Sequence, residues 1–229
     1  MKLYRSMEDR DRGLEIPIPN PQSLFPQKNI KNYVLDFGGV LYEINHFASF
    51  QDFFLLSKNP ELFGDYSMKE YLNDELIIQF EKGLIEPVQF RNKVRGKLLL
   101  EAVDELFDKA FNETLIKIKP DAIECVQKLK NKGKVVLLSN TNQIHYEYFQ
   151  KECEELFSLF DELYFSYLLG ARKPEQEIFK ILLQKTGFTP NETLFVDDSV
   201  ENIAVAKDLG FATYMIDGEH SLSDLINNV

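Results

Sequence analysis

The stretch VLDFGGVL, residues 34–41, decides the fold, because it joins an apolar run to a glycine-containing loop. Residues 33–36 are typical of a short buried strand, and the run ends in the carboxylate of Asp36. Gly38 and Gly39 follow, and glycine lets the backbone approach a ligand closely. A carboxylate at the end of a buried strand is costly unless it is paired or binds a metal. The stretch therefore predicts a functional residue at Asp36.

Short apolar runs alternate with helical patterns from residue 31 onward. The runs occupy residues 134–138, 162–165, 193–196 and 213–216, and the helical patterns occupy residues 121–130, 174–187 and 200–209. This alternation is typical of an α/β fold in which a Rossmann-like parallel sheet carries helices on both faces. Pro174 suits the first turn of the second helix, and Ser199 suits the N-cap of the third.

An insertion separates the first two strands. Roughly 100 residues lie between Asp36 and Ser139, whereas one strand–helix–strand crossover needs only about 30. Within the gap, Ser67 and Glu70 form a capping-box pair ahead of one apolar helical pattern, and a second pattern covers residues 88–100. We therefore expect residues 45–118 to form an all-helical cap domain over the carboxyl ends of the strands.

The remaining residues are assigned to a core domain and a leader. The predicted core comprises residues 31–44 and 119–229. Residues 1–30 are charged and then proline-rich, so we expect an irregular N-terminal leader. No apolar stretch has the length of a signal peptide or of a membrane-spanning helix.

Composition bounds the class of protein and its partners. The 229 residues are 44% hydrophobic and 28% charged, which is enough apolar material to form a folded core. The net charge of −11, without a basic cluster, argues against nucleic acid or an anionic membrane as a partner. Cys125 and Cys153 have no metal-ligand spacing, so we interpret them as cytoplasmic thiols rather than as a disulfide or a nucleophile. The oligomeric state is left open.

Four polar clusters fall just after predicted strands. They occupy residues 36–41, 139–142, 172–174 and 197–199. Because the carboxyl ends of parallel strands meet at one edge of a sheet, we expect these clusters to converge there. Three carboxylates, a hydroxyl and a lysine in one place suit Mg²⁺ beside a phosphoryl group, since Mg²⁺ prefers oxygen ligands and lysine offsets phosphate charge.

In this order, the segments VLDFGGVL, VVLLSN, ARKP and LFVDDS resemble the four motifs of the haloacid dehalogenase (HAD) superfamily of hydrolases. The resemblance covers residues 31–229. The longer stretches SNTNQIHYEYF, LLGARKPEQEIF and FVDDSVENIAVAKDLG are most similar to the alpha-D-glucose-1-phosphate phosphatase-like sugar phosphatases of that superfamily. Each motif is short, but four in sequence order are a strong signal.

The resemblance implies a role for each motif residue. Asp36 would attack phosphorus and form an aspartyl-phosphate, which water then hydrolyses. Ser139 would donate to a phosphoryl oxygen with help from Asn140 as a substrate-binding residue, and Lys173 would neutralise charge on the transferred group. On their own, Ser139 and Asn140 would be read as helix caps, and Lys173 as a surface residue.

The same resemblance implies the metal ligands. Asp36, the backbone carbonyl of Gly38 and Asp198 would bind Mg²⁺ directly, whereas Asp197 would act through a water molecule or hold the lysine. Two nearby basic residues receive no catalytic role: Arg172 is expected to form a salt bridge or lie on the surface, and His145 to be a half-exposed helix residue.

One position departs from the superfamily pattern. Most phosphatases of this superfamily carry a second aspartate two residues after the nucleophile, and Gly38 stands there instead. General acid–base help is worth roughly 10²–10⁴-fold, so its loss favours a substrate with an easier leaving group, such as an anomeric sugar phosphate. The sugar-1-phosphate relatives share the glycine. Glu43 and His46 are the candidates for the missing acid–base residue.

The favoured function is a Mg²⁺-dependent phosphomonoesterase that acts on a small phosphorylated metabolite, in particular a sugar phosphate. A dehalogenase or epoxide hydrolase-like carbon hydrolase of the same fold is the first alternative, and the Asp197–Asp198 pair counts against it. A catalytically idle domain that binds a phosphorylated ligand or a protein partner is the second. The substrate itself depends on cap side chains whose orientation cannot be read from the sequence.

Overall fold

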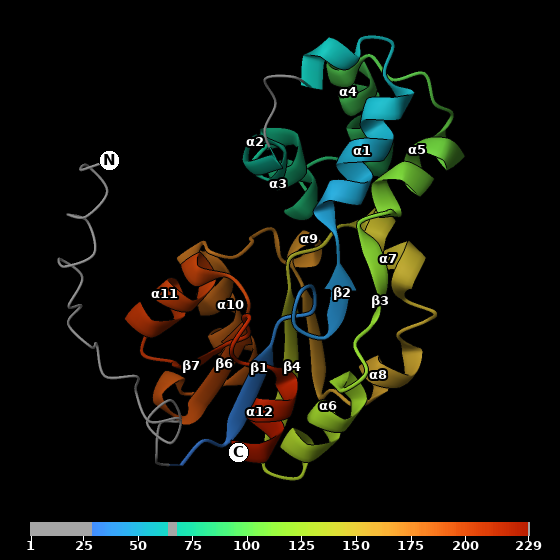
Figure 1. Ribbon diagram of the computed structural model, residues 1–229. Coiled ribbons are helices and arrows are strands. Elements are labelled where there is room, and N and C mark those ends of the chain that lie inside the picture. The colour runs from blue at the N-terminus through green and yellow to red at the C-terminus, as the bar shows by residue number, and fades with distance from the viewer. Residues whose placement is uncertain (1–28, 64–67, 229) are drawn as a thin grey trace, which may run out of the picture.

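The computed structural model describes residues 29–63 and 68–228 (Figure 1). The predicted leader falls almost entirely outside these residues, and Ser67 of the expected capping box does too. At the centre lies a parallel five-stranded sheet in the order β5-β4-β1-β6-β7. Its strands are β1 (Asn32–Leu35), β4 (Lys134–Ser139), β5 (Glu162–Phe165), β6 (Thr193–Asp197) and β7 (Ala212–Met215). The predicted α/β class is confirmed.

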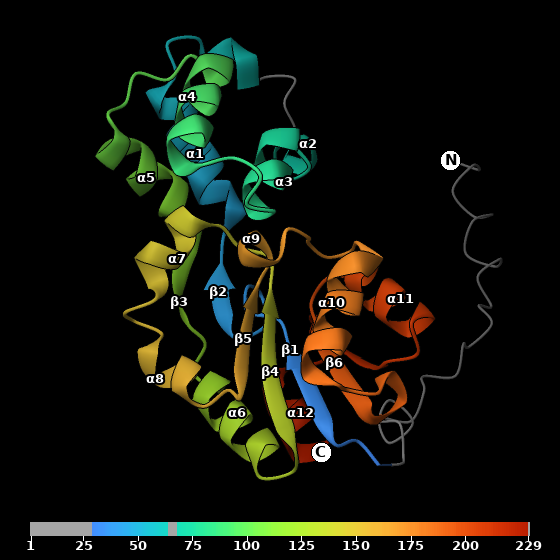
Figure 2. The same ribbon diagram turned by 180° about the vertical axis from the view of Figure 1, so that it is seen from behind.

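Both faces of this sheet are covered by helices, as the alternation along β1 requires (Figures 1 and 2). Tyr33 and Leu35 pack in one core with α6 (Ala122–Lys130) and α12 (Leu222–Asn228). Val34 packs in a second core with α10 (Gln176–Thr186) and α11 (Val200–Asp208). Successive side chains of a strand point to opposite faces, so a strand buried on both sides reads as a continuous apolar run.

The ends of the core helices follow their sequence signals with one exception. Ser199 is the N-cap of α11, and its hydroxyl accepts a hydrogen bond from the backbone of Asn202. The expectation that Pro174 lies in a helical first turn is wrong, because α10 begins at Gln176. The Glu175 N–H donates to the Arg172 carbonyl at 2.9 Å and closes a turn around Pro174, so the helix starts only after that turn.

A group of helices is inserted between β1 and β4 and lies over the carboxyl ends of the sheet strands (Figure 1). It comprises α1 (His46–Leu56), η2 (Pro60–Phe63), α2 (Met68–Leu72), α3 (Glu75–Glu81), α4 (Pro87–Leu98) and α5 (Asp104–Asn112). These helices share an apolar core of their own, rich in phenylalanine. Phe80 and Phe90 stack in it with ring centroids 4.2 Å apart. We refer to these helices as the cap.

The structure differs from the all-helical expectation over residues 115–118. These residues form β3 (Leu115–Ile118), which pairs with β2 (Tyr42–Ile44) in a separate antiparallel sheet. The segment LIKI has two β-branched isoleucines, and the chain leaving β1 provides a partner strand, so its backbone groups are satisfied by pairing. The β2–β3 ribbon connects the main sheet to the cap (Figure 1).

Short elements complete the described chain. They are α7 (Gln143–Phe149), α8 (Glu154–Ser158), α9 (Ser166–Leu169) and η3 (Pro190–Glu192). Among the described residues, no helix has the length and apolar character needed to cross a membrane.

Candidate active site

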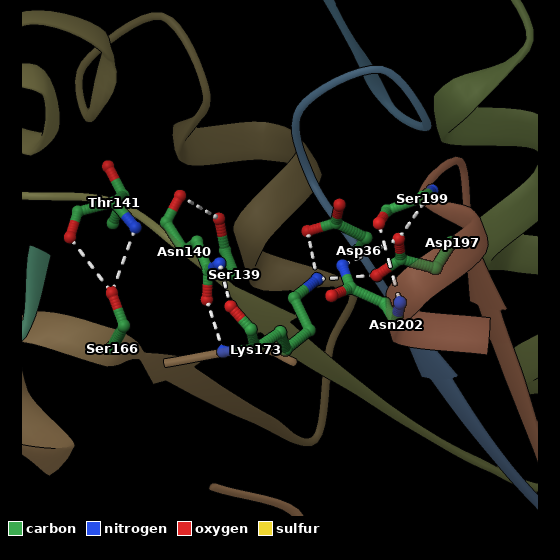
Figure 3. Close-up of polar contacts among 9 residues, drawn as sticks. All are labelled: Asp36, Ser139, Asn140, Thr141, Ser166, Lys173, Asp197, Ser199 and Asn202. Carbon is green, nitrogen blue, oxygen red and sulfur yellow. Dashed lines mark hydrogen bonds and ion pairs between the residues drawn. The ribbon is translucent and has the colours of Figure 1, made fainter. Parts of the chain in front are cut away.

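The site forms where β1, β4 and β6 end side by side beneath the cap (Figures 1 and 3). Asp36 directly follows β1, Ser139 ends β4 and Asp197 ends β6. The backbone of Asp36 stays in register with the neighbouring strand, because its N–H donates to the Val196 carbonyl at 2.9 Å. Strand order therefore brings residues about 160 positions apart to one edge, as expected for a parallel sheet.

Lys173 is the central cation of the site. Its side chain is 1% exposed, and Nζ lies 2.7 Å from Asp36 Oδ1 and 2.6 Å from Asp197 Oδ2 (Figure 3). The Asn140 side chain fixes the lysine backbone from both sides: it accepts from the Lys173 N–H at 2.8 Å and donates to the Lys173 carbonyl at 2.9 Å. The ammonium is thus held in place by packing and by two carboxylates.

Asp197 is fully buried, and both of its oxygens are engaged. Oδ2 accepts from Lys173, whereas Oδ1 accepts from the Ser199 N–H at 2.8 Å and from Asn202 Nδ2 at 2.9 Å. This saturation suits a residue that positions the lysine. Asn202 was missed by sequence reasoning, although its place in the first turn of α11, just after a motif carboxylate, was an available signal.

The carboxylates fit a divalent cation. Oxygens of Asp36, Asp197 and Asp198 all lie within 4.8 Å of one another, and only Lys173 provides a positive charge directly bonded to them among the described residues. Burial raises the pKa of Asp36 to about 8; Lys173 acts to lower it, and the two other aspartates raise it further. A hard cation with oxygen ligands, such as Mg²⁺, would compensate this excess negative charge.

The glycine loop leaves room for Asp198. Gly39 has a φ of 74°, and a Cβ at this position would lie 1.9 Å from Asp198 Oδ2. The loop is closed by the Gly39 N–H, which donates to the Tyr42 carbonyl at 2.9 Å, and by Lys119, whose ammonium donates to the Gly39 carbonyl. Any side chain in place of Gly39 would displace the carboxylate, so this glycine is required by close packing.

Ser139 lies at the same edge but makes a weak contact. Its side chain is 1% exposed, and Oγ donates to the Asn140 carbonyl at 3.3 Å. That distance is long for a hydroxyl donor, so rotation toward a ligand would cost little. The structure therefore brings Ser139, Asn140 and Lys173 beside Asp36, while their catalytic and binding roles stay predictions.

A cavity of about 420 Å³ opens from the carboxylates toward the cap. Its sheet end is lined by Asp36, Gly38, Asn140, Lys173 and Asp198. Its cap end is lined by Leu72, Asn73, Ile77 and Glu81, with Ile44 and His46 between the two ends. A cavity of this size matches a small metabolite.

Of the two acid–base candidates, one lines the cavity and the other does not. His46 lines it, and His46 Nδ1 lies 3.0 Å from the Thr114 hydroxyl, while burial lowers the pKa of the imidazole. Glu43 does not line it: this side chain is 46% exposed, with Oε2 3.8 Å from the Lys117 ammonium. Of the two, only His46 is placed to exchange a proton with a substrate.

Arg172 and His145 both support the cap. Arg172 Nε lies 3.0 Å from Glu81 Oε2 on α3, which agrees with the expected salt bridge. The His145 ring stacks on Phe111 with centroids 4.3 Å apart, and Nε2 lies 3.3 Å from the Phe111 carbonyl. Burial lowers the pKa of His145 to about 3. His145 therefore acts as a neutral packing residue between α7 and the cap.

The cysteines play no part in this site. Cys125 and Cys153 are both free and buried, and burial raises the pKa of each thiol to about 12. Neither side chain lines the cavity. A thiol with so high a pKa is a poor nucleophile, so the interpretation of these residues as packing thiols fits their surroundings.

The fold and the site together define a hydrolase class, in which a carboxylate at a parallel sheet edge faces a capped cavity. A family model of the haloacid dehalogenase-like hydrolases matches residues 30–210. The chain belongs to this family.

Curated relatives extend over most of the chain. A D-ribitol-5-phosphate phosphatase of Bacteroides thetaiotaomicron is 32% identical over 194 residues, which is 81% of this chain and 91% of the relative. The sesquiterpene phosphatase astK of Aspergillus oryzae is 29% identical over 79% of this chain and 86% of the relative. Both relatives are phosphatases.

Solved structures show the same fold. A HAD family enzyme of Bacteroides thetaiotaomicron, in complex with magnesium and inorganic phosphate, superposes with a TM-score of 0.74 at 34% identity and covers 86% of this chain and 99% of its own. A HAD-like hydrolase of Porphyromonas gingivalis has a TM-score of 0.75 at 29% identity, over 87% and 97% of the two chains. An L-2-haloacid dehalogenase of Xanthobacter autotrophicus, at 20% identity and a TM-score of 0.59, shares the fold alone.

Proposed function

We propose that this chain is a Mg²⁺-dependent phosphomonoesterase that hydrolyses a small sugar or polyol phosphate. The observation that carries the proposal is the buried Asp36–Lys173–Asp197 bridge with Asp198 beside it, at the floor of a capped cavity. The similarity to a ribitol-5-phosphate phosphatase, and to a HAD enzyme that binds magnesium and phosphate, supports the same conclusion.

The reaction would proceed in two displacements. Asp36 Oδ1 is engaged by Lys173, which leaves the second oxygen to attack phosphorus while the bond to the leaving oxygen breaks. Water then attacks the aspartyl-phosphate, inorganic phosphate departs, and the carboxylate is restored. Lys173 would balance charge on the transferred group, and Ser139 and Asn140 would donate to its oxygens.

Metal binding belongs to the same proposal. Asp36, Asp198 and the Gly38 carbonyl would hold Mg²⁺, which when bound would neutralise the phosphoryl oxygens, with Asp197 acting through water or the lysine. His46 would take the acid–base position of the aspartate that Gly38 replaces, and its neutral imidazole would accept the proton of the water that attacks the aspartyl-phosphate. The excess negative charge of the carboxylates supports this chemistry over the metal-free carbon hydrolase.

Two placements accompany the proposed function. We assign phosphate binding to the core domain, residues 31–44 and 119–229, and the rest of the substrate to the cap domain, residues 45–118. We place the protein in the cytoplasm, which its two free thiols support. Its partner would be a small phosphorylated metabolite, with no nucleic acid, since the chain carries a net charge of −11.

A phosphate-release screen tests the function. Ribitol 5-phosphate, glucose 1-phosphate and p-nitrophenyl phosphate would be incubated with the protein in Mg²⁺ or in excess chelator. We expect Mg²⁺-dependent release that disappears in Asp36→Asn. Full activity in chelator would revive the carbon hydrolase, and no release from any ester would favour an idle binding domain.

A further inference from the structure

Two ion pairs join the end of α3 to the core (Figure 1 shows α3 above α9 and α10). Glu81 Oε2 lies 3.0 Å from Arg172 Nε, and Lys82 Nζ lies 3.0 Å from Glu175 Oε1. The next residue, Gly83, has a φ of 64° and packs on the Tyr167 carbonyl, where a Cβ would lie 2.1 Å away. The end of α3 is therefore held against the core at a defined position.

The two pairs differ in where they face. Glu81 and Arg172 line the cavity, and each side chain is 18% exposed. Lys82 and Glu175 do not line it, and they are 23% and 39% exposed. We call Glu81–Arg172 the inner pair and Lys82–Glu175 the outer pair. Both have the same distance and lie at the end of α3, so the outer pair is a matched control for the inner one.

The carboxylate of Glu81 is unexpected in a cavity that binds phosphate. Burial raises the pKa of Glu81, and Arg172 and Lys173 both act to lower it, so Glu81 lies within electrostatic reach of the phosphate end. A buried carboxylate is expensive even when paired, and it repels a phosphate dianion. Arg172 offsets that repulsion in part, but a purely phosphate-binding cavity would be better without Glu81.

Hydroxyl groups on the substrate would resolve this conflict, because a carboxylate accepts their hydrogen bonds. We propose that Glu81, oriented by Arg172, binds hydroxyls on the carbon chain of the substrate and thereby selects polyol and sugar phosphates over apolar phosphate esters. Asn73 lines the same end of the cavity and adds an amide, so the cap presents polar groups rather than a fully apolar wall. This inference rests on the proposed phosphatase function and assigns the residue that selects its substrate class.

The physical basis is the asymmetry of buried polar groups. A hydrogen bond between a hydroxyl and a buried carboxylate is stronger than one between two neutral groups. An apolar ester displaces water from Glu81 and forms no hydrogen bond in its place. The carboxylate is then buried without a partner, which weakens binding of the apolar ester. Glu81 therefore strengthens binding of hydroxylated phosphate esters and weakens binding of apolar ones.

The test measures a ratio of two activities. kcat/KM for ribitol 5-phosphate or glucose 1-phosphate is divided by kcat/KM for p-nitrophenyl phosphate, which carries no hydroxyl. In Glu81→Leu, this ratio should fall by about 10–100-fold, as expected for lost hydrogen bonds to a charged group. In the isosteric Glu81→Gln, whose amide oxygen still accepts a neutral hydrogen bond, the ratio should fall by a smaller factor. Glu175→Gln breaks the outer pair and should leave the ratio unchanged. Thermal unfolding checks that each variant is folded.

The outcomes separate the two claims. If wild-type protein shows no Asp36-dependent hydrolysis of any ester, the proposed function fails. If hydrolysis occurs but the Glu81 variants lower both activities equally, Glu81 only fastens the cap, and the hydroxyl-binding inference is overturned. A wild-type preference for an apolar prenyl phosphate over every polyol phosphate tested would overturn it as well.

Discussion

The electrostatics of Asp36 combine burial, one lysine and two further carboxylates. Burial and the aspartates disfavour its ionised form, and Lys173 favours it. Because Lys173 also binds Asp197 at 2.6 Å, the lysine remains paired when the charge of Asp36 is removed. The nucleophile can thus be neutralised without leaving a buried ammonium alone, which makes Asp36 a suitable position for a mutational test.

Asp36→Asn should lower turnover by orders of magnitude while the fold survives. Asparagine has nearly the same shape as aspartate, but it lacks the anionic oxygen that would attack phosphorus. Because Lys173 stays paired with Asp197 and repulsion from the other two aspartates is relieved, the metal-free variant should also be at least as resistant to heat as the wild type. Phosphate release and circular dichroism melting measure the two effects. Near-normal hydrolysis in this variant would exclude the covalent mechanism.

Ser139→Ala should lower kcat on the order of 10²–10³-fold, the usual cost of one donor to a transition-state oxygen. Ser166→Ala is the matched control. The Ser166 hydroxyl accepts from the Thr141 N–H at 3.0 Å and donates to the Thr141 carbonyl at 2.9 Å, whereas the Ser139 hydroxyl makes only the 3.3 Å contact with the Asn140 carbonyl (Figure 3). Its loss should therefore reduce the melting temperature more than kcat. Equal kcat values for Ser139→Ala and wild type would remove Ser139 from the mechanism.

Residues at strand ends could be predicted from the sequence, and residues on helices could not. Asp36 and Asp197 follow or end apolar runs, and parallel strands bring their ends together, so their convergence follows from the pattern alone. Glu81 and Asn202 reach the site from helices. Their positions depend on how each helix is rotated and packed, and the periodicity of one sequence does not specify that.

At the scale of elements, the least predictable segment was 115–118. Its four residues are too few to show a period, so a strand and a helix end look alike in the sequence. The strand is formed by pairing with β2, a tertiary partner about 70 residues earlier in the chain. The strands of the main sheet were predicted within one or two residues, because their short apolar runs alternate with helical patterns and the central strands β1, β4 and β6 are almost fully buried.

The contact between α7 and the cap should make stability depend on pH. The pKa of His145 falls from 6.5 to about 3 on folding, so between these values the unfolded chain binds a proton that the folded chain does not. Stability is therefore lost as the pH falls through this window, by up to about 1.4 kcal/mol per pH unit. His145→Phe retains an aromatic ring on Phe111 and removes the titration.

Urea unfolding at pH 7 and pH 5.5 checks this expectation. The loss of unfolding free energy between the two pH values should be smaller in His145→Phe than in wild type. His220→Gln, at the surface beside Asp217 and away from the contact between α7 and the cap, serves as the control and should not reduce the loss. An identical loss in His145→Phe and wild type would show that His145 is protonated equally in the folded and unfolded states.

At the scale of the whole molecule, the cavity belongs to two bodies joined by the β2–β3 ribbon and by the end of α3. The sheet supplies the groups suited to phosphate, and the cap supplies Glu81 and Asn73. Closure of a cap over such a site excludes water and completes the set of binding groups. The end of α3 places Glu81 against Arg172, which precedes Lys173 in the chain. The ion pair therefore fixes the position of Glu81 in the cap relative to Lys173 in the core.

Mg²⁺ should stabilise the whole protein, because folding brings together the carboxylates that bind it. The unfolded chain has no such site. A ligand at 100 times its dissociation constant adds about 2.7 kcal/mol to the unfolding free energy, which raises the melting temperature by several degrees in a domain of this size. Asp198→Asn should abolish most of that increase. In chelator, the same variant should melt no lower than wild type, since one of three crowded carboxylates is gone.

The control is Asp208→Asn, an exposed carboxylate at the end of α11 and outside this cluster, which should retain the full Mg²⁺-dependent increase. Melting curves with Mg²⁺ and with chelator measure all three proteins without any assumption about the substrate. If Mg²⁺ raises the melting temperature of Asp198→Asn as much as that of wild type, the metal binds elsewhere, and the excess negative charge around Asp36 must be balanced by protonation instead.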